Sequence, residues 1–246
     1  MPDLQWLRTV YHGLPPNLLK ANFGKGDYLA FLGRLSPEKG PHRAIKWARS
    51  TGLPLRIAAK IPEDGSRFFK KQIEPFVDGR KVQYVGEVND NTKSDFLGRA
   101  QALLFPIDWP EPFGLVMIEA MACGTPVIAL PCGSVPEIVS DSKTGYIVSN
   151  DVDAIGAINR IREIDRRQVR AEFEHRFSAR RMAQEYLRCY SDLIAPTKTG
   201  ELGARLGIKT NSHNLGDLYA EAISPAPGRM RQGCGDTAVV IAGVRG

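Results

Sequence analysis

Two cations and two carboxylates in this sequence have the types and spacing to bind a small charged ligand. Arg34 and Lys39 follow a short apolar run and precede a predicted helix. Arginine offers a planar fork of donors and lysine a point charge, and the two together suit a diphosphate. Glu111 and Glu119 are separated by seven residues, with Gly114 between them. This set of charges predicts a site for an anionic ligand that also carries hydroxyl groups.

The predicted helix that opens at Gly114 is itself a candidate anion site. The free N–H groups of a helix start and the positive end of its dipole attract negative charge. A carboxylate at Glu111, just before that start, would repel a bare phosphate unless sugar hydroxyls lay between them and donated hydrogen bonds. The combination favours a sugar diphosphate over a bare nucleotide. A simpler interpretation stays open, in which Arg34 and Lys39 are solvated loop cations, one glutamate caps the helix and the other is an exposed helical residue.

The elements that must position these residues alternate between short apolar runs and helical patterns, as in βαβ units around a parallel sheet. The runs are apolar almost throughout, which is typical of strands covered by helices on both faces. We therefore predict an α/β fold with a parallel sheet of about six strands covered by helices. The predicted strands are 28–32, 55–59, 82–85, 102–105, 126–130 and 145–148, and the predicted helices between them are 40–50, 68–76, 91–100 and 114–123.

The carboxyl ends of parallel strands lie at one edge of such a sheet, where open α/β sheets bind their ligands. Segments 33–40 and 108–119 follow predicted strands, and so does 85–91, which could offer backbone amides to a flat heterocycle. We therefore expect these three segments to converge in space. The loops 133–137 and 141–145 are interpreted mainly as turns.

The pattern becomes helical after residue 150, with helices predicted at 152–161 and through 182–190. Between them lies the basic run from Asp165 to Arg170, which we interpret as a solvated helix face in preference to a nucleic-acid contact. Segment 197–246 is rich in glycine and contains one isolated apolar run, 238–242. We expect this tail to be poorly ordered or to lie outside the main domain.

Composition excludes several classes of protein. The 246 residues are 43% hydrophobic and 24% charged, which argues against disorder, collagen and coiled coil. No run approaches the roughly 18 apolar residues of a membrane helix and no secretory signal is evident, so we expect a soluble, cytoplasmic protein. The four cysteines lack metal-ligand spacing and are expected to be thiols, with no structural metal. The net charge of +6 suits an anionic partner and leaves peripheral membrane contact open.

Several motifs together resemble the nucleotide-sugar-binding half of the retaining family 4 (group 1) glycosyltransferases. The resemblance covers roughly residues 9–194, and its most specific part is the Glu-x7-Glu element followed by a Met-Ala-Cys-Gly-Thr-Pro run. The segments that carry it are Gly33–Arg34, Lys39–Gly40, Glu111–Glu119, Ala120–Ile128, Gly133–Glu137 and Thr144–Gly145.

The resemblance implies a role for each residue of the set. Arg34 and Lys39 would hold the donor diphosphate and stabilise negative charge on the leaving group, and Glu111 would contact the donor sugar. No metal is required for such electrostatic stabilisation. The implied donor-binding set places Gly33 at the end of the first strand, Val88 near the base, the backbone of Phe113, Gly114 and Leu115 at the sugar and phosphate, and Glu119 on the ribose hydroxyls. The implied donor is a UDP-, GDP- or ADP-sugar, and no other cofactor is expected.

The resemblance also predicts the domain organisation. These enzymes have the GT-B architecture, in which the active site lies between two Rossmann-like domains and the acceptor site is mostly on the N-terminal one. We expect residues 1–20 to be a remnant of the inter-domain linker, 21–195 to be the Rossmann-like nucleotide-sugar-binding domain with C-terminal helices, and 196–246 to be an atypical tail. The N-terminal domain is then missing from this chain.

A chain organised in this way would need a partner for its missing half. The acceptor domain could be supplied by a separate chain, or the chain could associate with itself through an exposed apolar patch on its final helix, at Met182, Tyr186 and Cys189. Three other interpretations are kept: a non-catalytic nucleotide-sugar-binding module, a sugar-nucleotide epimerase of similar fold, and nucleic-acid binding, of which we expect the last least.

Overall fold

A six-stranded parallel sheet forms the centre of the larger of two compact units, which runs from Val10 to Gln184. The computed structural model describes residues 4–61, 66–194 and 242–244. The strand order is β4-β3-β2-β5-β6-β7, and the predicted α/β fold is confirmed. The strands are β2 (Tyr28–Leu32), β3 (Leu55–Ala58), β4 (Val82–Gly86), β5 (Ala100–Phe105), β6 (Val127–Ala129) and β7 (Gly145–Ile147).

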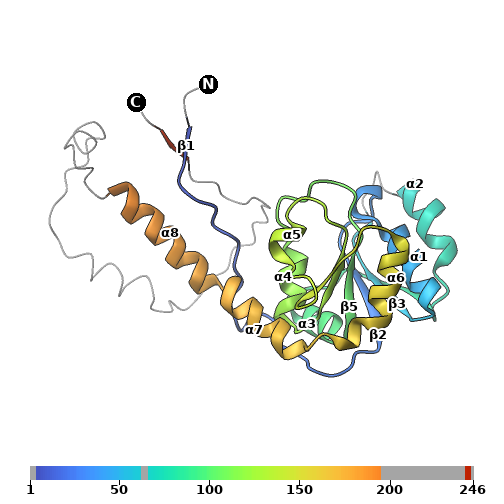
Figure 1. Cartoon of the computed structure of the whole chain (residues 1–246). Helices are drawn as coiled ribbons and strands as arrows, with labels where there is room; N and C mark the ends of the chain where they lie inside the picture. The colour runs from blue at the N-terminus through green and yellow to red at the C-terminus, as the bar shows by residue number, and fades with distance from the viewer. Residues whose placement is uncertain (1–3, 62–65, 195–241, 245–246) are drawn as a thin grey trace. The chain divides into compact units, whose positions relative to one another are not determined.

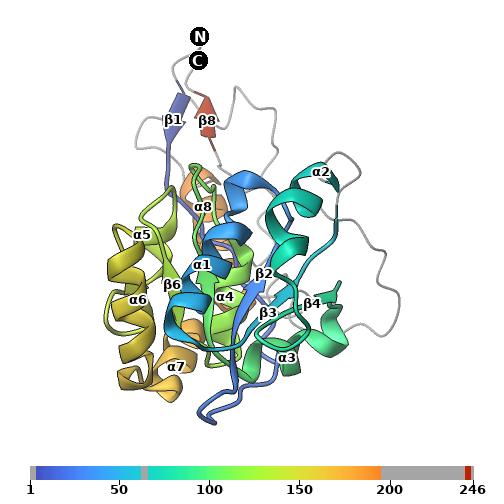
Figure 2. The ribbon, with the colours of Figure 1, turned by 90° about the vertical axis from the view of Figure 1, so that its right-hand side faces the viewer.

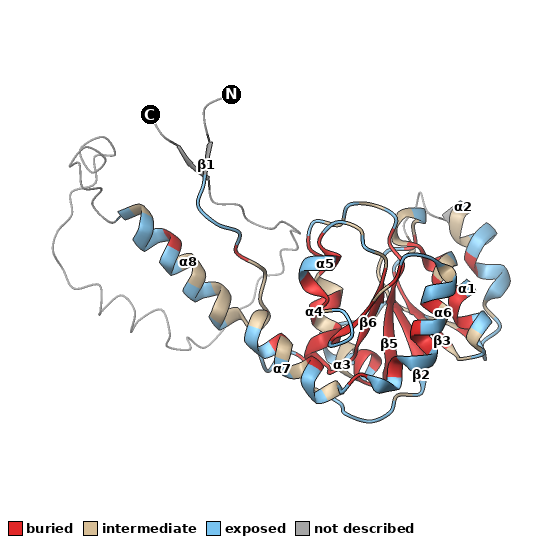
Figure 3. Cartoon of the chain, viewed as in Figure 1, coloured by how far each residue is buried: buried red, intermediate tan, exposed pale blue. Residues whose placement is uncertain are grey.

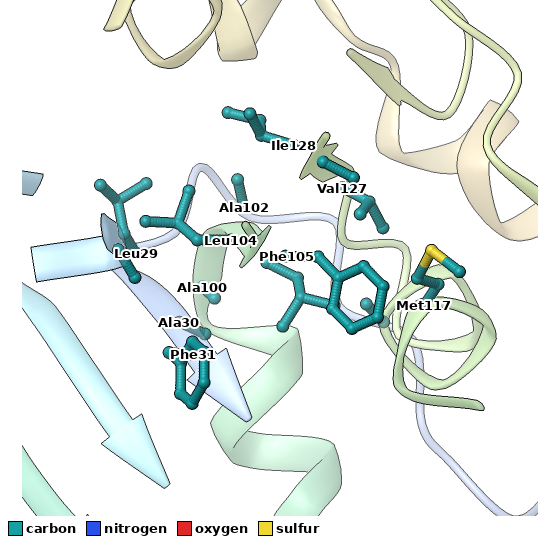
Figure 4. Packing of buried hydrophobic residues seen from close by; sticks show 14 of the residues in the cluster. Leu29, Ala30, Phe31, Ala100, Ala102, Leu104, Phe105, Met117, Val127 and Ile128 are labelled. Carbon is teal, nitrogen blue, oxygen red and sulfur yellow. The ribbon is translucent and has the colours of Figure 1, made fainter. Parts of the chain in front are cut away.

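The central strands are buried on both faces, as their apolar runs predict (Figure 3). Every residue of β5 is buried, and its register pairs Leu103 with Val127 of β6. Figure 4 shows the side chains of β2, β5 and β6 packed together, with Phe105 and Met117 joining the sheet to the helix that follows it. The burial of these apolar side chains is the main favourable contribution to the fold.

Helices cover both faces of the sheet (Figures 1 and 2). One face carries α1 (Pro41–Thr51) and α6 (Asp151–Arg160), which contact each other and the strands beneath them. The other face carries α3 (Asp90–Gly98), α4 (Leu115–Ala122) and α7 (Arg166–Arg176). The sheet is therefore the middle layer of three.

Local signals explain where several helices begin and end. Pro41 is the first residue of α1, where its missing N–H costs nothing, and Gly52 ends this helix in the left-handed conformation at φ 70°. Asn89 caps α3 through a capping box with Thr92. The predicted end of this helix at residue 100 is wrong, because Ala100 opens β5 and pairs with Tyr28.

Two further predictions of secondary structure need correction. The helix predicted at 68–76 is three short pieces: α2 (Ser66–Phe68), a π-helical turn (Phe69–Ile73) and a 3-10 turn (Glu74–Phe76). Pro75 accounts for the break, because it has no N–H to continue an α-helical ladder. Residues 133–137, interpreted as a turn, contain the start of a short helix, α5 (Val135–Ile138).

The basic run at the start of α7 is a solvated face only in part: Arg167 and Gln168 are exposed, whereas Arg166 and Arg170 are half-buried. Arg166 donates to the carbonyls of Asn22, Gly98 and Ala100 at 2.6 to 2.9 Å. Arg170 in the same way donates to backbone carbonyls, those of Pro16, Leu19 and Ala122. These two arginines bind loops of the larger unit together, because helix α7 packs on α4 and brings their guanidinium groups to carbonyls left free at segment ends.

The larger unit also includes the second half of the segment that we assigned to the linker. Val10 and Leu19 are buried, and Leu14 forms a backbone bridge with Ser178 just before the last helix. That helix, α8 (Ala179–Ile194), crosses from the larger unit into the smaller one, which comprises Met1–Thr9 and Glu185–Gly246.

The apolar patch predicted on α8 is wrong in its residues. Cys189 is buried, and Met182 and Tyr186 are half-buried. The large apolar side chains that α8 exposes are instead Leu187, Tyr190 and Ile194, which are spaced three and four residues apart and so share one face.

The smaller unit contains a two-stranded antiparallel sheet of β1 (Leu4–Trp6) and β8 (Ala242–Val244). Within the same unit, Arg8 and Asp192 form an ion pair at 2.9 Å. The remainder of the predicted tail, and Cys234 with it, lies outside the described residues, while Cys123, Cys132 and Cys189 are free thiols.

Candidate functional site

The candidate site lies where the strand order of the sheet reverses. From β2 the chain continues to β3 on one side, whereas β5 is followed by β6 on the other side. Ligands of doubly wound sheets bind outside the carboxyl ends of the strands at such a switch point. The loop after β2 carries Lys39 and the loop after β5 carries Glu111, so these two residues meet there from opposite sides.

Lys39, Trp109 and Glu111 form one polar cluster. The Lys39 Nζ and the Trp109 Nε1 both donate to Oε2 of Glu111, the latter at 2.7 Å, and the ammonium lies 5.0 Å from the centre of the Trp109 ring. The side chains of Lys39 and Glu111 are only 15% and 12% exposed. Among the described residues, none donates to Oε1 of Glu111, so this oxygen is available to accept a hydrogen bond from a ligand.

The loop that presents Lys39 is held tightly against the loop after β5. It forms a 3-10 turn (Pro37–Lys39), and the Asp108 N–H donates to the Glu38 carbonyl at 2.8 Å. Gly40 has φ 72°, and a Cβ there would lie 2.1 Å from the carbonyl oxygen of Pro106. Only glycine therefore permits this approach, which brings the two loops together.

The backbone around Glu111 is supported from α5. The Ser134 N–H donates to the Glu111 carbonyl at 2.9 Å, and its hydroxyl donates to the Phe113 carbonyl at 2.8 Å. Gly133 has φ 58°, and a Cβ on it would lie 2.3 Å from the Glu111 carbonyl oxygen. The segment interpreted as a simple turn therefore fixes the position of Glu111.

Helix α4 begins beside this carboxylate. Gly114 precedes it with φ 76°, in the left-handed conformation. Within the described part of the chain, the N–H groups of Gly114, Leu115 and Val116 have no acceptor, whereas the Met117 N–H donates to the Gly114 carbonyl at 2.9 Å. The side chain of Phe113 is buried and packs edge-on against His12, with ring centroids 4.8 Å apart. Free N–H groups and a positive dipole end therefore lie next to Glu111.

Glu119, one turn further along α4, has a lysine partner of its own. Lys93 of α3 donates to Oε1 of Glu119 at 2.7 Å and lies 3.5 Å from Asp90. Burial disfavours the charged form of Lys93, but the two carboxylates outweigh it, and the pKa of the ammonium is raised above its usual value. Each glutamate of the Glu-x7-Glu element is thus paired with a lysine from a neighbouring segment.

Three other predicted site residues, Arg34, Val88 and Gly33, lie at the carboxyl edge of the sheet but belong to neither lysine–glutamate pair. Arg34 is exposed, and no hydrogen bond or ion pair engages its side chain within the described residues. Val88 follows β4 and packs against the core. Gly33 ends β2 in a conformation open to any residue, and an added Cβ would meet only Phe31, at 3.9 Å. These three residues therefore leave room for a ligand.

Sequence reasoning missed three residues of the site. Trp109 could have been noticed, because it lies two residues before Glu111 in a loop between two prolines. Ser134 lies in the Gly133–Glu137 segment of the resemblance, but nothing in that segment indicates its contact with Glu111, which is 23 positions away. Lys93 carries no local signal, because its partner lies 26 positions away and only the fold brings the two together.

The described residues contain neither a cluster of metal-ligating side chains nor a helix that could cross a membrane. Residues 4–61, 66–194 and 242–244 contain no group of three or more His, Cys, Asp or Glu side chains that could hold a metal ion. In the same residues, no helix has the length and apolar character needed to span a bilayer.

Comparisons with known proteins agree on one family. The sequence model described as "Glycosyl transferases group 1" matches residues 20–181. The D-inositol 3-phosphate glycosyltransferase of Jonesia denitrificans is 32% identical over 139 residues, which are 50% of this chain and 31% of that protein. The chain thus spans about a third of the length of this curated relative.

Solved structures share the fold. HepE of Anabaena in complex with UDP-glucose matches with a TM-score of 0.64 and 21% identity, over 76% of this chain and 57% of that one. The C-terminal domain of LpcC, a group 1 glycosyl transferase family protein from Francisella tularensis, is covered completely by 68% of this chain, with a TM-score of 0.59 and 17% identity. The chain therefore belongs to the group 1 glycosyl transferases, and its larger unit has the Rossmann-like fold of their C-terminal domain.

Proposed function

We propose that the larger unit binds a nucleoside diphosphate sugar at the carboxyl edge of its sheet and acts as the donor half of a retaining, family 4 glycosyltransferase. One observation carries the proposal: Lys39 and Glu111 meet at the switch point, beside the unpaired N–H groups at the start of α4. Cations, N–H donors and a carboxylate in one place suit a ligand that is both a phosphate ester and a polyol.

The diphosphate would lie between Arg34, Lys39 and the start of α4. Arg34 is exposed at the end of β2 and has its full set of donors available for phosphate oxygens. In glycosyl transfer a hydroxyl oxygen of the acceptor forms a bond to the anomeric carbon of the sugar and loses its proton. The bond between the sugar and the diphosphate breaks, and its electron pair leaves with the diphosphate. The added negative charge is then stabilised by these cations and by the helix start, all of which are in position before the reaction.

Glu111 would contact the donor sugar. Its Oε2 already accepts from Lys39 and Trp109, and its Oε1 faces no donor among the described residues. A sugar hydroxyl can therefore donate to Oε1 while the other oxygen stays fixed. Because Lys39 touches both the carboxylate and the proposed diphosphate position, it would join the sugar and phosphate parts of the site.

Glu119 would bind the ribose in the same manner. Lys93 occupies Oε1 and so orients the carboxylate, which leaves Oε2 for the ribose hydroxyls. The base would then extend toward the loop after β4, near Val88. The UDP-glucose complex of HepE, a fold neighbour, supports a nucleotide sugar as ligand without deciding which base this chain prefers.

Calorimetric titration of the purified chain with UDP-glucose, GDP-mannose and ADP-glucose tests the proposal. We expect saturable binding of one of them, with the matching nucleoside diphosphate binding as well. Lys39→Met should raise the Kd of the nucleoside diphosphate at least tenfold, because a charge-assisted hydrogen bond is lost, and should leave the Kd of the bare nucleoside unchanged.

Lys81→Met is the matched control. Lys81 precedes β4 at the opposite edge and donates to the Gly52 carbonyl at 2.7 Å, so its removal changes the charge equally without touching the site. Failure of all three sugar nucleotides to bind the folded chain would refute the proposal.

A further inference from the structure

A cavity lies at the amino edge of the sheet. Lys39 and Glu111 lie at the opposite, carboxyl edge. The volume of the cavity is about 340 Å³, and it belongs entirely to the larger unit. Gln101, the second residue of β5, and Pro126, which precedes β6, line it from the sheet. Nothing in the proposed donor site uses this part of the molecule.

Gln101 is the polar residue of this cavity whose burial is not explained by a contact with the rest of the described chain. The residue as a whole is 6% exposed, and no hydrogen bond engages its side-chain amide within the described residues. The amide is not sealed in the core, because Gln101 lines the cavity. The amide therefore has access to the cavity, where it can donate to water or to a polar atom of a ligand.

A β-bulge lies at Gln101. Tyr28 of β2 pairs with Ala100 and Leu29 pairs with Ala102, so Gln101 is an extra residue between two regular pairs. Bulges of this kind redirect a side chain and are frequent beside functional sites. The departure from regular pairing therefore explains why a polar side chain is tolerated at the start of a fully buried strand.

The mouth of the cavity is positively charged. Lys25, Arg162 and Arg167 line it and are exposed, and none of them forms an ion pair within the described part of the chain. The one acidic residue of the lining, Asp165, accepts a hydrogen bond from the Arg167 N–H at 2.9 Å and so caps α7. Arg166 lines the cavity but is not available to a ligand. Backbone carbonyls and the Thr125 hydroxyl already accept hydrogen bonds from its guanidinium.

The rest of the lining is apolar. Phe23 is 41% exposed, with the Arg167 guanidinium 4.5 Å from its ring centre, and Pro126, Ile161 and Ile164 contribute aliphatic surface. A ligand of this cavity must therefore combine an anionic group with an apolar body.

We propose that the cavity binds a small molecule in which a phosphate or carboxylate is attached to an aromatic or aliphatic group. The amide N–H of Gln101 donates to the anionic group, the cations of the mouth compensate its charge, and Phe23 and Pro126 contact the apolar body. Because the cavity lies at the edge opposite the proposed donor site, the two ligands bind without competing.

Titration of ¹⁵N-labelled chain with phenyl phosphate, followed by two-dimensional NMR, tests the proposal. We expect saturable shifts of the Gln101 side-chain amide and of residues 23–25, both with and without saturating nucleotide sugar. Gln101→Leu should raise the Kd at least tenfold, because it removes one charge-assisted hydrogen bond at nearly constant volume. Gln72→Leu, a matched change at an exposed position, should leave the Kd unchanged.

A second variant and two further ligands complete the test. Arg162→Met, at an exposed position that the fold does not need, should also weaken binding, so the proposal stays testable if the Gln101 variant does not fold. Benzyl alcohol, which lacks the charge, and inorganic phosphate, which lacks the apolar body, should each bind more weakly than phenyl phosphate.

Three results would overturn the proposal. The first is the absence of saturable shifts up to about 20 mM phenyl phosphate. The second is an unchanged Kd in Gln101→Leu or in Arg162→Met. The third is a set of shifts confined to residues 111–119 and abolished by nucleotide sugar, since phenyl phosphate would then be binding at the donor site.

Discussion

The Lys39–Glu111 pair should affect stability and ligand binding in different ways, and a double-mutant cycle separates the two. Both side chains are nearly enclosed, at 15% and 12% exposure, and Trp109 adds a second donor to Glu111 at 2.7 Å. Breaking a fully buried ion pair costs roughly 3–5 kcal/mol, and losing a hydrogen bond to a charged group costs roughly 1.5–3 kcal/mol. Since Trp109 remains as a donor and some water contact persists, we expect Lys39→Met to cost about 2 kcal/mol.

The double variant Lys39→Met/Glu111→Gln should recover part of this loss. A neutral glutamine needs no counter-charge and can still accept from Trp109, so the two substitutions should couple by about 1–2 kcal/mol. The affinity for nucleoside diphosphate should stay low, because the cation is absent. Stability is therefore expected to recover in part in the double variant, whereas the affinity is not.

Urea unfolding followed by circular dichroism measures the first quantity, and calorimetry measures the second. In a thermal scan, 2 kcal/mol corresponds to a decrease in Tm of about 4–8 °C for a domain of this size. Additivity of the two substitutions within about 0.5 kcal/mol would refute the reasoning, because it would mean that the two side chains do not interact in the folded protein. Recovery of affinity in the double variant would refute the role given to Lys39.

Three other perturbations test separate parts of the structure. Gly133→Ala should weaken nucleotide-sugar binding at least tenfold and lower stability, because its Cβ would lie 2.3 Å from the Glu111 carbonyl oxygen at φ 58°. Arg170→Met should lower the free energy of unfolding in urea by about 2–3 kcal/mol, because backbone carbonyls lose a charged donor. Cys123 should resist alkylation by iodoacetamide at pH 8, measured by peptide mapping, because burial raises its pKa to about 12. Since the unfolded thiol has the lower pKa, stability should also fall as the pH rises from about 9 toward 12.

Matched controls accompany these predictions. Gly156→Ala in α6 meets no atom within 4 Å and should raise stability by about 0.5–1 kcal/mol. Arg180→Met, at an exposed position of α8, should be nearly neutral. Cys132, which is half-buried, should react with iodoacetamide faster than Cys123. Equal effects of a test variant and its control would contradict the corresponding contact.

The layers of the fold and the edge that carries the site could be predicted from the sequence. Apolar runs such as 28–32 can be satisfied only by burial on both faces, and alternation with helices implies parallel strands. Parallel strands bring the residues after them to one edge, which is why Lys39 and Glu111 could be expected to converge. Glycines at helix ends, such as Gly52, could be interpreted locally, because they meet a requirement of the backbone itself.

The partners of individual side chains could not be predicted, because they depend on distances that packing sets. The reversal of strand order between β2 and β5 is a property of the assembled sheet, and it is what brings Lys39 to Glu111. Lys93 finds Glu119 because α3 packs beside α4, and nothing near Lys93 in the chain distinguishes it from a solvated lysine.

The same reason explains the errors. Arg166 lies in a run whose local pattern indicates a solvated helix face. Gln101, for which the sequence pattern makes no prediction, lies in a strand whose other residues are all apolar. Whether a polar side chain meets water, a carbonyl or a cavity depends on chain segments that are far away in the sequence, so the local pattern does not indicate it. Order along the chain specified which elements form, and their packing selected which charges meet and which amide faces a cavity.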